Sequence, residues 1–260
     1  MELEGKVALV TGGGRGLGRA TALALAEQGA KVVALARSLA EVEETARLIR
    51  QQYGVGRSMA IQADVTHERD VVSAFEMVRR RWGGVDILVN NAGDTGATKP
   101  IMSLSLEEWQ RAIDVNVTGS FLCAREALRD MARRRWGRIV NVSSGVAAGA
   151  VPAMAPYSVA KAAVEHFTRL LAAEGAGMGV VAVALRPGVV DTRMQQDLRS
   201  RSNEDMPSEL RAIFTAYKQK GRLVPPERPA QIIAYLCSNR AGDVNGKVLD
   251  AREVEELLVR

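Results

Sequence analysis

Short apolar runs alternate with helix-length segments along almost the whole chain, and this rhythm limits the possible folds more than any other feature. In the intervening segments apolar residues return every three to four positions, as in the stretch from Ala20 to Ala26. Strands that alternate with amphipathic helices are typical of a parallel sheet covered by helices on both faces. We therefore expect a doubly wound α/β fold with a seven-stranded parallel sheet, in a single domain over residues 1–260. The expected strands lie at 6–11, 31–36, 57–63, 85–89, 138–143, 179–185 and 247–250.

The charge balance and the cysteines narrow the class of protein. There are 35 Lys and Arg residues against 30 Asp and Glu residues, but the cations are scattered rather than arranged in a stripe, so we expect no nucleic-acid partner. The densest group, residues 133–135, is expected at the solvated end of a helix. Cys123 and Cys237 show neither metal nor disulfide spacing and are expected to be buried. No apolar run is long enough for a membrane span and no leader precedes the first strand, so we expect no membrane partner and a cytoplasmic protein.

One segment, residues 193–222, interrupts the alternation after the sixth expected strand. It is rich in charge and Ser, and helical periodicity returns only from about Leu210. Insertions of this kind are often lids over a site, so we expect a mobile helical flap beside a substrate pocket. An exposed loop with no special role is the alternative. If the flap receives a substrate on an acidic carrier, Arg199 and Arg201 are the hypothetical contacts.

The first expected strand runs into a glycine-rich turn and then into an Ala-rich helix, which we expect to begin near Arg19. A strand, a glycine turn and a helix N-terminus present free backbone N–H groups and a positive dipole end to a pyrophosphate. The turn opens a complete strand–helix–strand unit that ends at Ala36, so it predicts a Rossmann-like dinucleotide site. The turn residues assigned to the cofactor are Thr11, Gly12, Gly14, Arg15, Gly16, Leu17 and Gly18.

The end of the second expected strand bears on the choice between the two nicotinamide cofactors. In dinucleotide folds an acidic residue at this place binds the ribose 2′-hydroxyl and repels a 2′-phosphate. The strand here ends at Ala36-Arg37-Ser38 without a carboxylate, and Arg37 offers a planar fork to a phosphate. Arg15 in the glycine turn adds a second cation. We therefore expect a preference for NADP(H), with use of NAD(H) left open.

Tyr157 and Lys161 stand four residues apart at the start of a helical run, so they share one face of that helix. A nearby ammonium favours the phenolate form of a tyrosine, so Lys161 is expected to tune Tyr157 as an acid and base. Ser144 follows the fifth expected strand, which places its hydroxyl at the carboxyl edge of the sheet, where ligands bind in open α/β folds.

At this point the sequence resembles the short-chain dehydrogenase/reductase family over nearly its whole length. The family's TGxxxGxG turn matches Thr11, Gly12, Gly16 and Gly18, and its NNAG segment matches residues 90–93. Its YxxxK motif matches Tyr157 and Lys161. The last expected strand, followed by residues 251–260, departs from the family's usual glycine-rich ending.

The resemblance implies a catalytic tetrad of Asn116, Ser144, Tyr157 and Lys161. In it, Tyr157 exchanges a proton with the carbonyl oxygen, Ser144 orients that oxygen, and Lys161 also holds the nicotinamide ribose. Asn116 would position a water that relays protons to Lys161. The residues that the resemblance adds to the cofactor site are Asp64 and Val65 at the adenine, Asn91, Ala92 and Gly93 at the ribose, and Pro187, Gly188, Val190 and Thr192 at the carboxamide.

The expected function is NADP(H)-dependent reduction of a ketone or aldehyde, and the layout is most similar to the 3-oxoacyl-acyl-carrier-protein reductases, whose substrate is a thioester. The alternatives are an NAD(H)-dependent sugar, polyol or steroid-like alcohol dehydrogenase and, in another class, a non-catalytic nucleotide-sensing protein. A methyltransferase would need the glycine turn without YxxxK. The resemblance also implies a homo-oligomer, a tetramer or dimer, formed through helices near 105–135 and 155–174. His67 and His166 do not suggest a metal.

Overall fold

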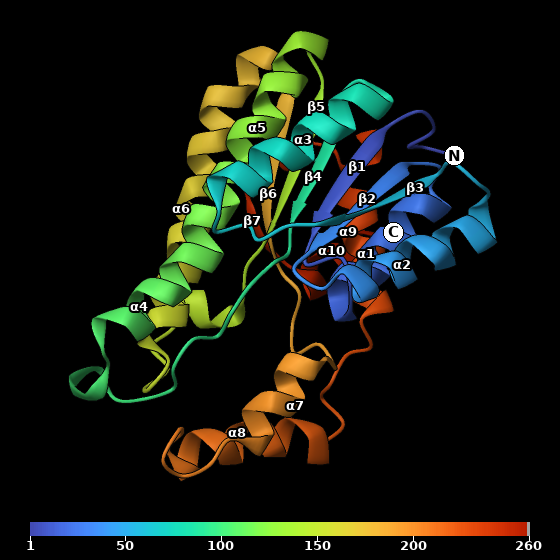
Figure 1. Cartoon of the computed structure of the whole chain (residues 1–260). Coiled ribbons are helices and arrows are strands. Elements are labelled where there is room, and N and C mark those ends of the chain that lie inside the picture. Colours follow the sequence, from blue (N-terminus) through green and yellow to red (C-terminus); the bar gives the residue numbers. More distant parts are fainter. Residues whose placement is uncertain (259–260) are drawn as a thin grey trace.

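The computed structural model describes residues 1–258, which form one seven-stranded parallel sheet in the order β3-β2-β1-β4-β5-β6-β7 (Figure 1). All seven expected strands are present and all pair in parallel, so the predicted doubly wound Rossmann-like fold is confirmed. The strand order turns outward in opposite directions from β1 and β4, and such a switch point opens a crevice at the carboxyl ends of the strands. The strands are β1 Val7–Thr11, β2 Lys31–Ala36, β3 Ser58–Gln62, β4 Ile87–Asn90, β5 Gly137–Val142, β6 Val180–Arg186 and β7 Val248–Asp250.

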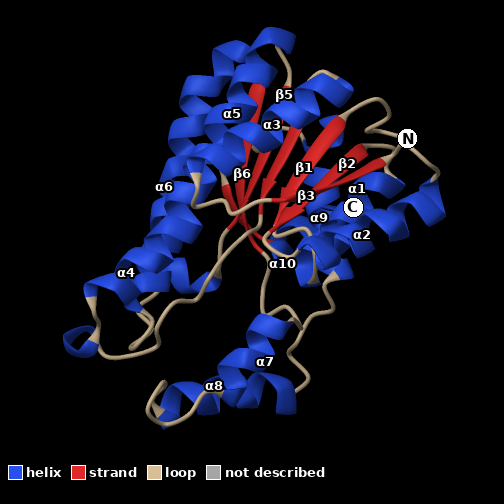
Figure 2. Ribbon diagram, in the orientation of Figure 1, coloured by secondary structure: helices blue, strands red, loops and turns tan. Residues whose placement is uncertain are grey.

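The strands bury both faces because alternate side chains pack on different helices. Ala8 and Val10 of β1 face a core built with α1, α2 and α9, whereas Val7 and Leu9 face a core built with α3, α5 and α6. Figure 2 shows the sheet enclosed between these two helical layers. The helices are α1 Gly16–Glu27, α2 Leu39–Tyr53, α3 Glu68–Trp82, α4 Leu106–Ile113, α5 Gly119–Arg134, α6 Ala155–Gly175, α7 Arg193–Ser200, α8 Ser208–Gln219, α9 Glu227–Leu236 and α10 Ala251–Leu258, with short 3-10 turns at Ile101–Ser103, Gly145–Ala148, Ala176–Met178 and Asn239–Ala241 and a π turn at Asp114–Thr118.

The two cysteines lie inside the helical layers, as expected. Cys123 is on α5 and Cys237 follows α9, and both are fully buried free thiols. Burial raises the pKa of each thiol to about 12. Across residues 1–258, no helix combines the length and the apolar character that a membrane crossing needs.

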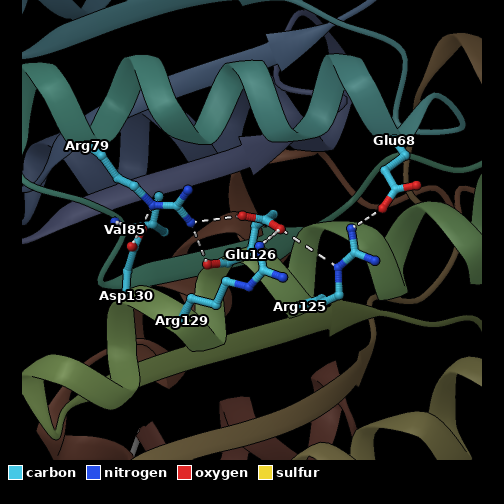
Figure 3. Close-up of polar contacts among 7 residues, drawn as sticks. All are labelled: Glu68, Arg79, Val85, Arg125, Glu126, Arg129 and Asp130. Carbon is cyan, nitrogen blue, oxygen red and sulfur yellow. Dashed lines mark hydrogen bonds and ion pairs between the residues drawn. The ribbon is translucent and has the colours of Figure 1, made fainter.

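Charged side chains fasten α3 to α5 on one face of the sheet (Figure 3). The Glu126 carboxylate is completely buried and pairs with Arg79 at 2.9 Å and Arg129 at 2.6 Å. Asp130 accepts from Arg79 at 2.7 Å and from the Val85 backbone N–H at 3.1 Å, which ties the start of β4 into the same group. A buried carboxylate needs such partners because an isolated charge is costly to remove from water.

The segment after β6 projects beyond the carboxyl edge of the sheet as two helices, α7 and α8 (Figure 1). The sequence pattern predicted helix only from about Leu210, and this prediction is wrong for α7, whose residues are mostly polar or charged and which buries only Leu198. Its apolar residues, with Leu210 and Phe214 of α8, pack around Met154 and Tyr157. Residues 193–222 therefore form a structured flap over the start of α6.

Candidate active site

A cavity of about 520 Å³ lies at the carboxyl edge of the sheet, between the glycine turn and the flap. One end is formed by the turn after β1, and the other end reaches Tyr157 and the side chains of α7. Seventeen residues were predicted to bind the cofactor without also being predicted as catalytic, and sixteen of them line this cavity. They are Gly12, Gly14, Arg15, Gly16, Leu17, Gly18, Arg37, Asp64, Val65, Asn91, Ala92, Gly93, Pro187, Gly188, Val190 and Thr192. The fold thus gathers into one cavity residues that the sequence spreads over five loops.

The glycine turn is a tight cradle in which side chains have no room. A Cβ at Gly18 would stand 2.1 Å from the Gly12 carbonyl oxygen, and one at Gly12 would meet the Asn91 amide at 2.8 Å. Gly12 and Gly16 also have positive φ, which L side chains rarely adopt. Helix α1 begins at Gly16 rather than near Arg19, because Gly16 and Gly18 of the glycine-rich segment already belong to the first turn of α1. No side chain caps this N-terminus, so its N–H groups face the cavity.

Thr11 differs from the other residues assigned to the cofactor, because it lies under the cavity instead of lining it. Its hydroxyl accepts from the backbone N–H groups of Asn91 and Ala92, both at 3.0 Å. The Asn91 side-chain amide in turn donates to the Thr11 carbonyl at 2.9 Å. Thr11 therefore fixes the loop after β4 against the glycine turn and acts on a ligand only through that loop.

The ribose end of the cavity carries a carboxylate that the strand sequence did not reveal. Glu41, in the first turn of α2, accepts a hydrogen bond from Arg15 at 3.2 Å and lines the cavity beside Arg37. The end of β2 itself has no acidic side chain, as expected, but the fold brings one in from the following helix. Arg37 is exposed at the same place, so two cations and one anion face the adenosine ribose position.

Asp64, after β3, lines the expected adenine end of the cavity. Its carboxylate accepts from the Thr66 backbone N–H at 2.9 Å and from the Thr66 hydroxyl at 2.8 Å. Burial acts to raise the pKa of Asp64, but these hydrogen bonds and the positive charge of Arg37 outweigh it and lower that pKa below the usual value. The carboxylate is therefore an ionised, fixed acceptor beside Val65.

Helix α6 places Tyr157 and Lys161 one turn apart at the cavity wall, 8% and 4% exposed. The Lys161 ammonium donates to the Val142 carbonyl of β5 at 2.8 Å and lies 5.6 Å from the centre of the Tyr157 ring. Burial lowers the pKa of Lys161 to about 8, because a buried ammonium loses hydration. Pro156 is the second residue of the helix and lies in its first turn, where its missing N–H costs no hydrogen bond.

The pKa of the Tyr157 phenol is raised, whereas the Lys161 ammonium alone was expected to lower it. Burial raises the pKa of Tyr157 to about 12, against the lowering effect of the Ser144 hydroxyl and with a further raising effect of the Asp94 carboxylate. Desolvation is the largest cause of this shift, and the phenol keeps its proton at neutral pH. A protonated phenol is ready to donate, which suits carbonyl reduction. Ser144 also caps the 3-10 turn after β5, where it accepts from the Val146 N–H at 3.4 Å.

Asn116 sits behind the cavity on a π turn that interrupts α4 and α5, a distortion often found at functional sites. Its amide nitrogen donates to the Asp94 and Ala112 carbonyls, both at 2.8 Å. Its Oδ1 is buried and has no hydrogen-bond partner among the described residues. A Cβ at Gly93 would lie 3.0 Å from this oxygen and 3.5 Å from the Lys161 ammonium nitrogen, so the free acceptor and Lys161 border the same small space.

The flap contributes apolar side chains to the cavity and is tied to the loop after β4. Arg201 donates to the Gly96 carbonyl at 3.0 Å and to the Thr98 and Thr95 hydroxyls at 2.8 and 3.0 Å. The Arg201 guanidinium therefore holds the flap, and a contact of Arg201 with an acidic carrier stays a prediction. The hydrogen bonds join segments about a hundred residues apart, so no local sequence pattern indicated them.

Comparisons with known proteins agree with this geometry. A model of the short chain dehydrogenase family matches residues 6–203. The 3-oxoacyl-acyl-carrier-protein reductase of Aquifex aeolicus (strain VF5) is 36% identical over 253 residues, 96% of each chain. A solved 3-ketoacyl-(acyl-carrier-protein) reductase from Brucella melitensis, complexed with NADH, is 34% identical with a TM-score of 0.82, over 95% of this chain and 97% of that one. An NAD⁺-bound xylitol dehydrogenase structure is 27% identical with a TM-score of 0.87, over 96% and 98%.

The residues also fit a nicotinamide dinucleotide on their own geometry. The glycine cradle admits only backbone at the pyrophosphate position, and the unpaired Asn116 oxygen lies beside the ammonium expected to hold the nicotinamide ribose. This chain belongs to the short-chain dehydrogenase/reductase family and is an NAD(P)-dependent oxidoreductase that acts on carbonyl and CH–OH groups.

Proposed function

We propose that the protein is an NADP(H)-preferring reductase of a 3-oxoacyl thioester, with Tyr157 as its general acid. The observation that carries this proposal is the placement of Tyr157 and Lys161 in one wall of the cavity whose far end is the glycine cradle with Arg37. A dinucleotide with its pyrophosphate on the glycine cradle would have Tyr157 and Lys161 at its nicotinamide end. The nicotinamide, when bound, supplies or accepts the hydride.

In reduction, Tyr157 donates its proton to the carbonyl oxygen, and Ser144 donates a hydrogen bond that orients the same oxygen. Lys161 stabilises the resulting phenolate, because an ammonium beside it favours the charged form. The free Oδ1 of Asn116 would hold a water beside Lys161. This water would pass a proton from solvent to Lys161, which returns a proton to the Tyr157 phenolate. In oxidation the proton moves in the opposite direction through the same groups.

The thioester assignment is supported by the apolar wall next to the phenol and by the names of the relatives. Met154, Leu198 and Phe214 line the cavity around Tyr157 and are nearly buried. Such a wall suits an acyl chain better than a polyol, whose hydroxyl groups need polar partners. The Aquifex aeolicus and Brucella melitensis proteins are both named as reductases of this substrate class.

The NADP(H) preference is supported by Arg37 and Arg15, since a planar guanidinium suits a 2′-phosphate. One observation favours the alternative, an NAD(H)-dependent sugar, polyol or steroid-like dehydrogenase: Glu41 occupies Arg15 and places a carboxylate at the ribose end. A carboxylate there would bind a free 2′-hydroxyl. A non-catalytic nucleotide sensor would not require Asn116, Ser144, Tyr157 and Lys161 together, so we set it aside.

We infer a homo-oligomer, a tetramer or a dimer, that buries the outer faces of α5 and α6. Phe121, Val159 and Leu170 on these helices are 43%, 46% and 48% exposed, and large apolar side chains gathered in this way often mark an interface. The partner is a second copy, as the family resemblance implies. We also propose the cytoplasm as the compartment, which suits two reduced, buried thiols.

A paired titration tests the proposed function. NADPH and NADH are titrated separately into the purified protein with nicotinamide fluorescence as the readout, followed by a rate assay with an acetoacetyl thioester and with xylitol. We expect tighter binding of NADPH and reduction of the thioester. Tighter binding of NADH with oxidation of xylitol would replace the proposal by its alternative, and binding without turnover of any carbonyl or alcohol would favour the sensor.

A further inference from the structure

A single carboxylate behind the cavity joins three segments that carry the site. The Glu165 side chain, 8% exposed, accepts a hydrogen bond from the Ser143 hydroxyl at 2.7 Å. It also binds the Arg186 guanidinium through two contacts, from Nε to Oε1 at 2.8 Å and from Nη2 to Oε2 at 2.9 Å. Two-point binding of this kind fixes orientation as well as distance, because both groups are planar.

Two residues of this group directly precede site residues in the sequence, and the third lies one helical turn from one. Ser143 precedes Ser144 at the end of β5. Arg186 ends β6 and precedes Pro187 and Gly188, which line the cavity where the carboxamide is expected. Glu165 lies one helical turn beyond Lys161, so its carboxylate and the Lys161 ammonium both reach from α6 to the end of β5.

Without this group, the ends of β5 and β6 would be held to α6 by fewer contacts. The strand ladder ties Ser143 to β6 through its N–H bond to the Leu185 carbonyl at 2.8 Å, and Lys161 holds the Val142 carbonyl. Neither contact fixes the rotation of the peptide that carries Ser144. The Ser143 hydroxyl bond to Glu165 adds a side-chain hold one residue before Ser144 and so restricts that peptide further.

We propose that Glu165, with Ser143 and Arg186, is a positioning group that sets the Ser144 hydroxyl and the 187–188 loop relative to Tyr157. The proposal rests on the proposed function of the tetrad. Ser143 lines the cavity, whereas Glu165 and Arg186 do not, and none of the three is assigned a contact with the substrate. Their effect is on the alignment of the carbonyl oxygen between Ser144 and Tyr157, so it falls on turnover more than on cofactor binding.

The chain provides a matched control in Glu126. This carboxylate is also buried and also bound by arginines, but it lies between α3 and α5 and away from the cavity (Figure 3). A purely structural role predicts that Glu126→Gln and Glu165→Gln act alike, on thermal stability alone. A positioning role predicts that only Glu165→Gln lowers kcat in protein that is still folded at the assay temperature.

The experiment measures kcat, KM for the carbonyl, the NADPH dissociation constant and Tm for four variants of the full chain. Ser143→Ala removes one hydroxyl and keeps the ion pair, so it tests the group even if Glu165→Gln does not fold. We expect Ser143→Ala and Glu165→Gln each to lower kcat about tenfold, the cost of one misplaced hydrogen bond, with cofactor affinity within about twofold. Glu126→Gln should lower Tm and keep kcat.

The fourth variant, Ser143→Ala with Glu165→Gln, completes a double-mutant cycle in kcat. If Glu165 acts through Ser143, the double variant loses little more than the worse single variant. Unchanged kcat in Ser143→Ala, or losses that multiply fully in the double variant, would overturn the proposal. Tyr157→Phe in the same assay separates the two claims: if it keeps turnover, the proposed function fails, whereas if it loses turnover while Ser143→Ala does not, only the positioning role fails.

Discussion

Charged side chains are buried in two regions of this protein, and the regions differ in whether each buried charge has an oppositely charged partner. Between α3 and α5, Glu126 and Asp130 are enclosed by arginines, so opposite charges balance. On the catalytic face of α6, Glu165 is balanced by Arg186, but the ion pairs of residues 1–258 include none at Lys161, whose ammonium donates to a carbonyl. Balanced charge fastens helices together. An unbalanced cation with a pKa lowered to about 8 is costly for folding and useful for moving protons.

We expect the largest change in the free energy of unfolding from a substitution between α3 and α5. Glu126→Gln leaves Arg79, Arg125 and Arg129 without their shared carboxylate, and we expect the free energy of unfolding to fall by about 3 kcal/mol, because removal of one member of a buried ion pair leaves the other uncompensated. Denaturant unfolding measures this change. The specific activity at a temperature well below Tm should stay at the wild-type level; a loss of activity in folded protein would break the distinction between the two regions.

At Lys161 we expect substitution to raise the free energy of unfolding rather than lower it. Lys161→Met should raise the free energy of unfolding at pH 7 by about 2 kcal/mol and abolish turnover, because the cost of a buried ammonium exceeds the hydrogen bond that is lost. In the wild type, stability should rise from pH 8 to about 10, since the unfolded chain there binds a proton that the folded Lys161 has released. Unfolding titrations at several pH values should show this rise in the wild type and a smaller one in the variant.

A smaller effect, on the acid side, is expected at Glu165. Burial acts to raise the pKa of Glu165, but hydrogen bonds from Arg186 and Ser143 outweigh it and lower that pKa. A carboxyl with a lowered pKa in the folded state adds stability at neutral pH that is lost as pH falls through that pKa. Glu165→Gln should therefore cost about 1.5 kcal/mol at pH 7 and progressively less below pH 4. A difference that stays constant with pH would show that the carboxylate charge is not the cause.

The smallest effect is expected at the exposed pair of Arg15 and Glu41. Glu41→Gln should change the free energy of unfolding by less than about 0.5 kcal/mol, because half-exposed pairs contribute little. The freed Arg15 should then bind a 2′-phosphate, so the dissociation constant of NADPH should fall by about threefold while that of NADH does not. Nicotinamide fluorescence measures both, and Glu44→Gln, on the outer face of α2, is the matched control.

The sequence predicted the features that depend on local pattern. The strand and helix alternation, the glycine turn and the spacing of Tyr157 and Lys161 each lie within a short stretch, so residue type and period were sufficient. The seven strands and their parallel pairing are confirmed. The positions of the cofactor residues around one cavity followed from the rule that parallel strands end at the same edge.

The features that sequence analysis missed depend on contacts between distant segments. Arg201 reaches Thr95 and Glu41 reaches Arg15 only after the elements pack. The helix α7 was missed because its polar residues hide the period. The direction of the Tyr157 pKa was wrong because the degree of burial is a property of the packed flap and not of the YxxxK motif. An Arg directly before Pro187 and a Glu one turn after Lys161 were the only local signs of the positioning group.

The most direct test of the account is a single-turnover measurement with Tyr157→Phe. The variant is loaded with NADPH, mixed with an excess of the acetoacetyl thioester, and followed by the loss of nicotinamide fluorescence. We expect NADPH to bind as it does to the wild type and the rate of its oxidation to fall by about a thousandfold, because the proton donor to the carbonyl oxygen is missing. Oxidation within a few-fold of the wild-type rate would contradict the assignment of Tyr157 as the general acid.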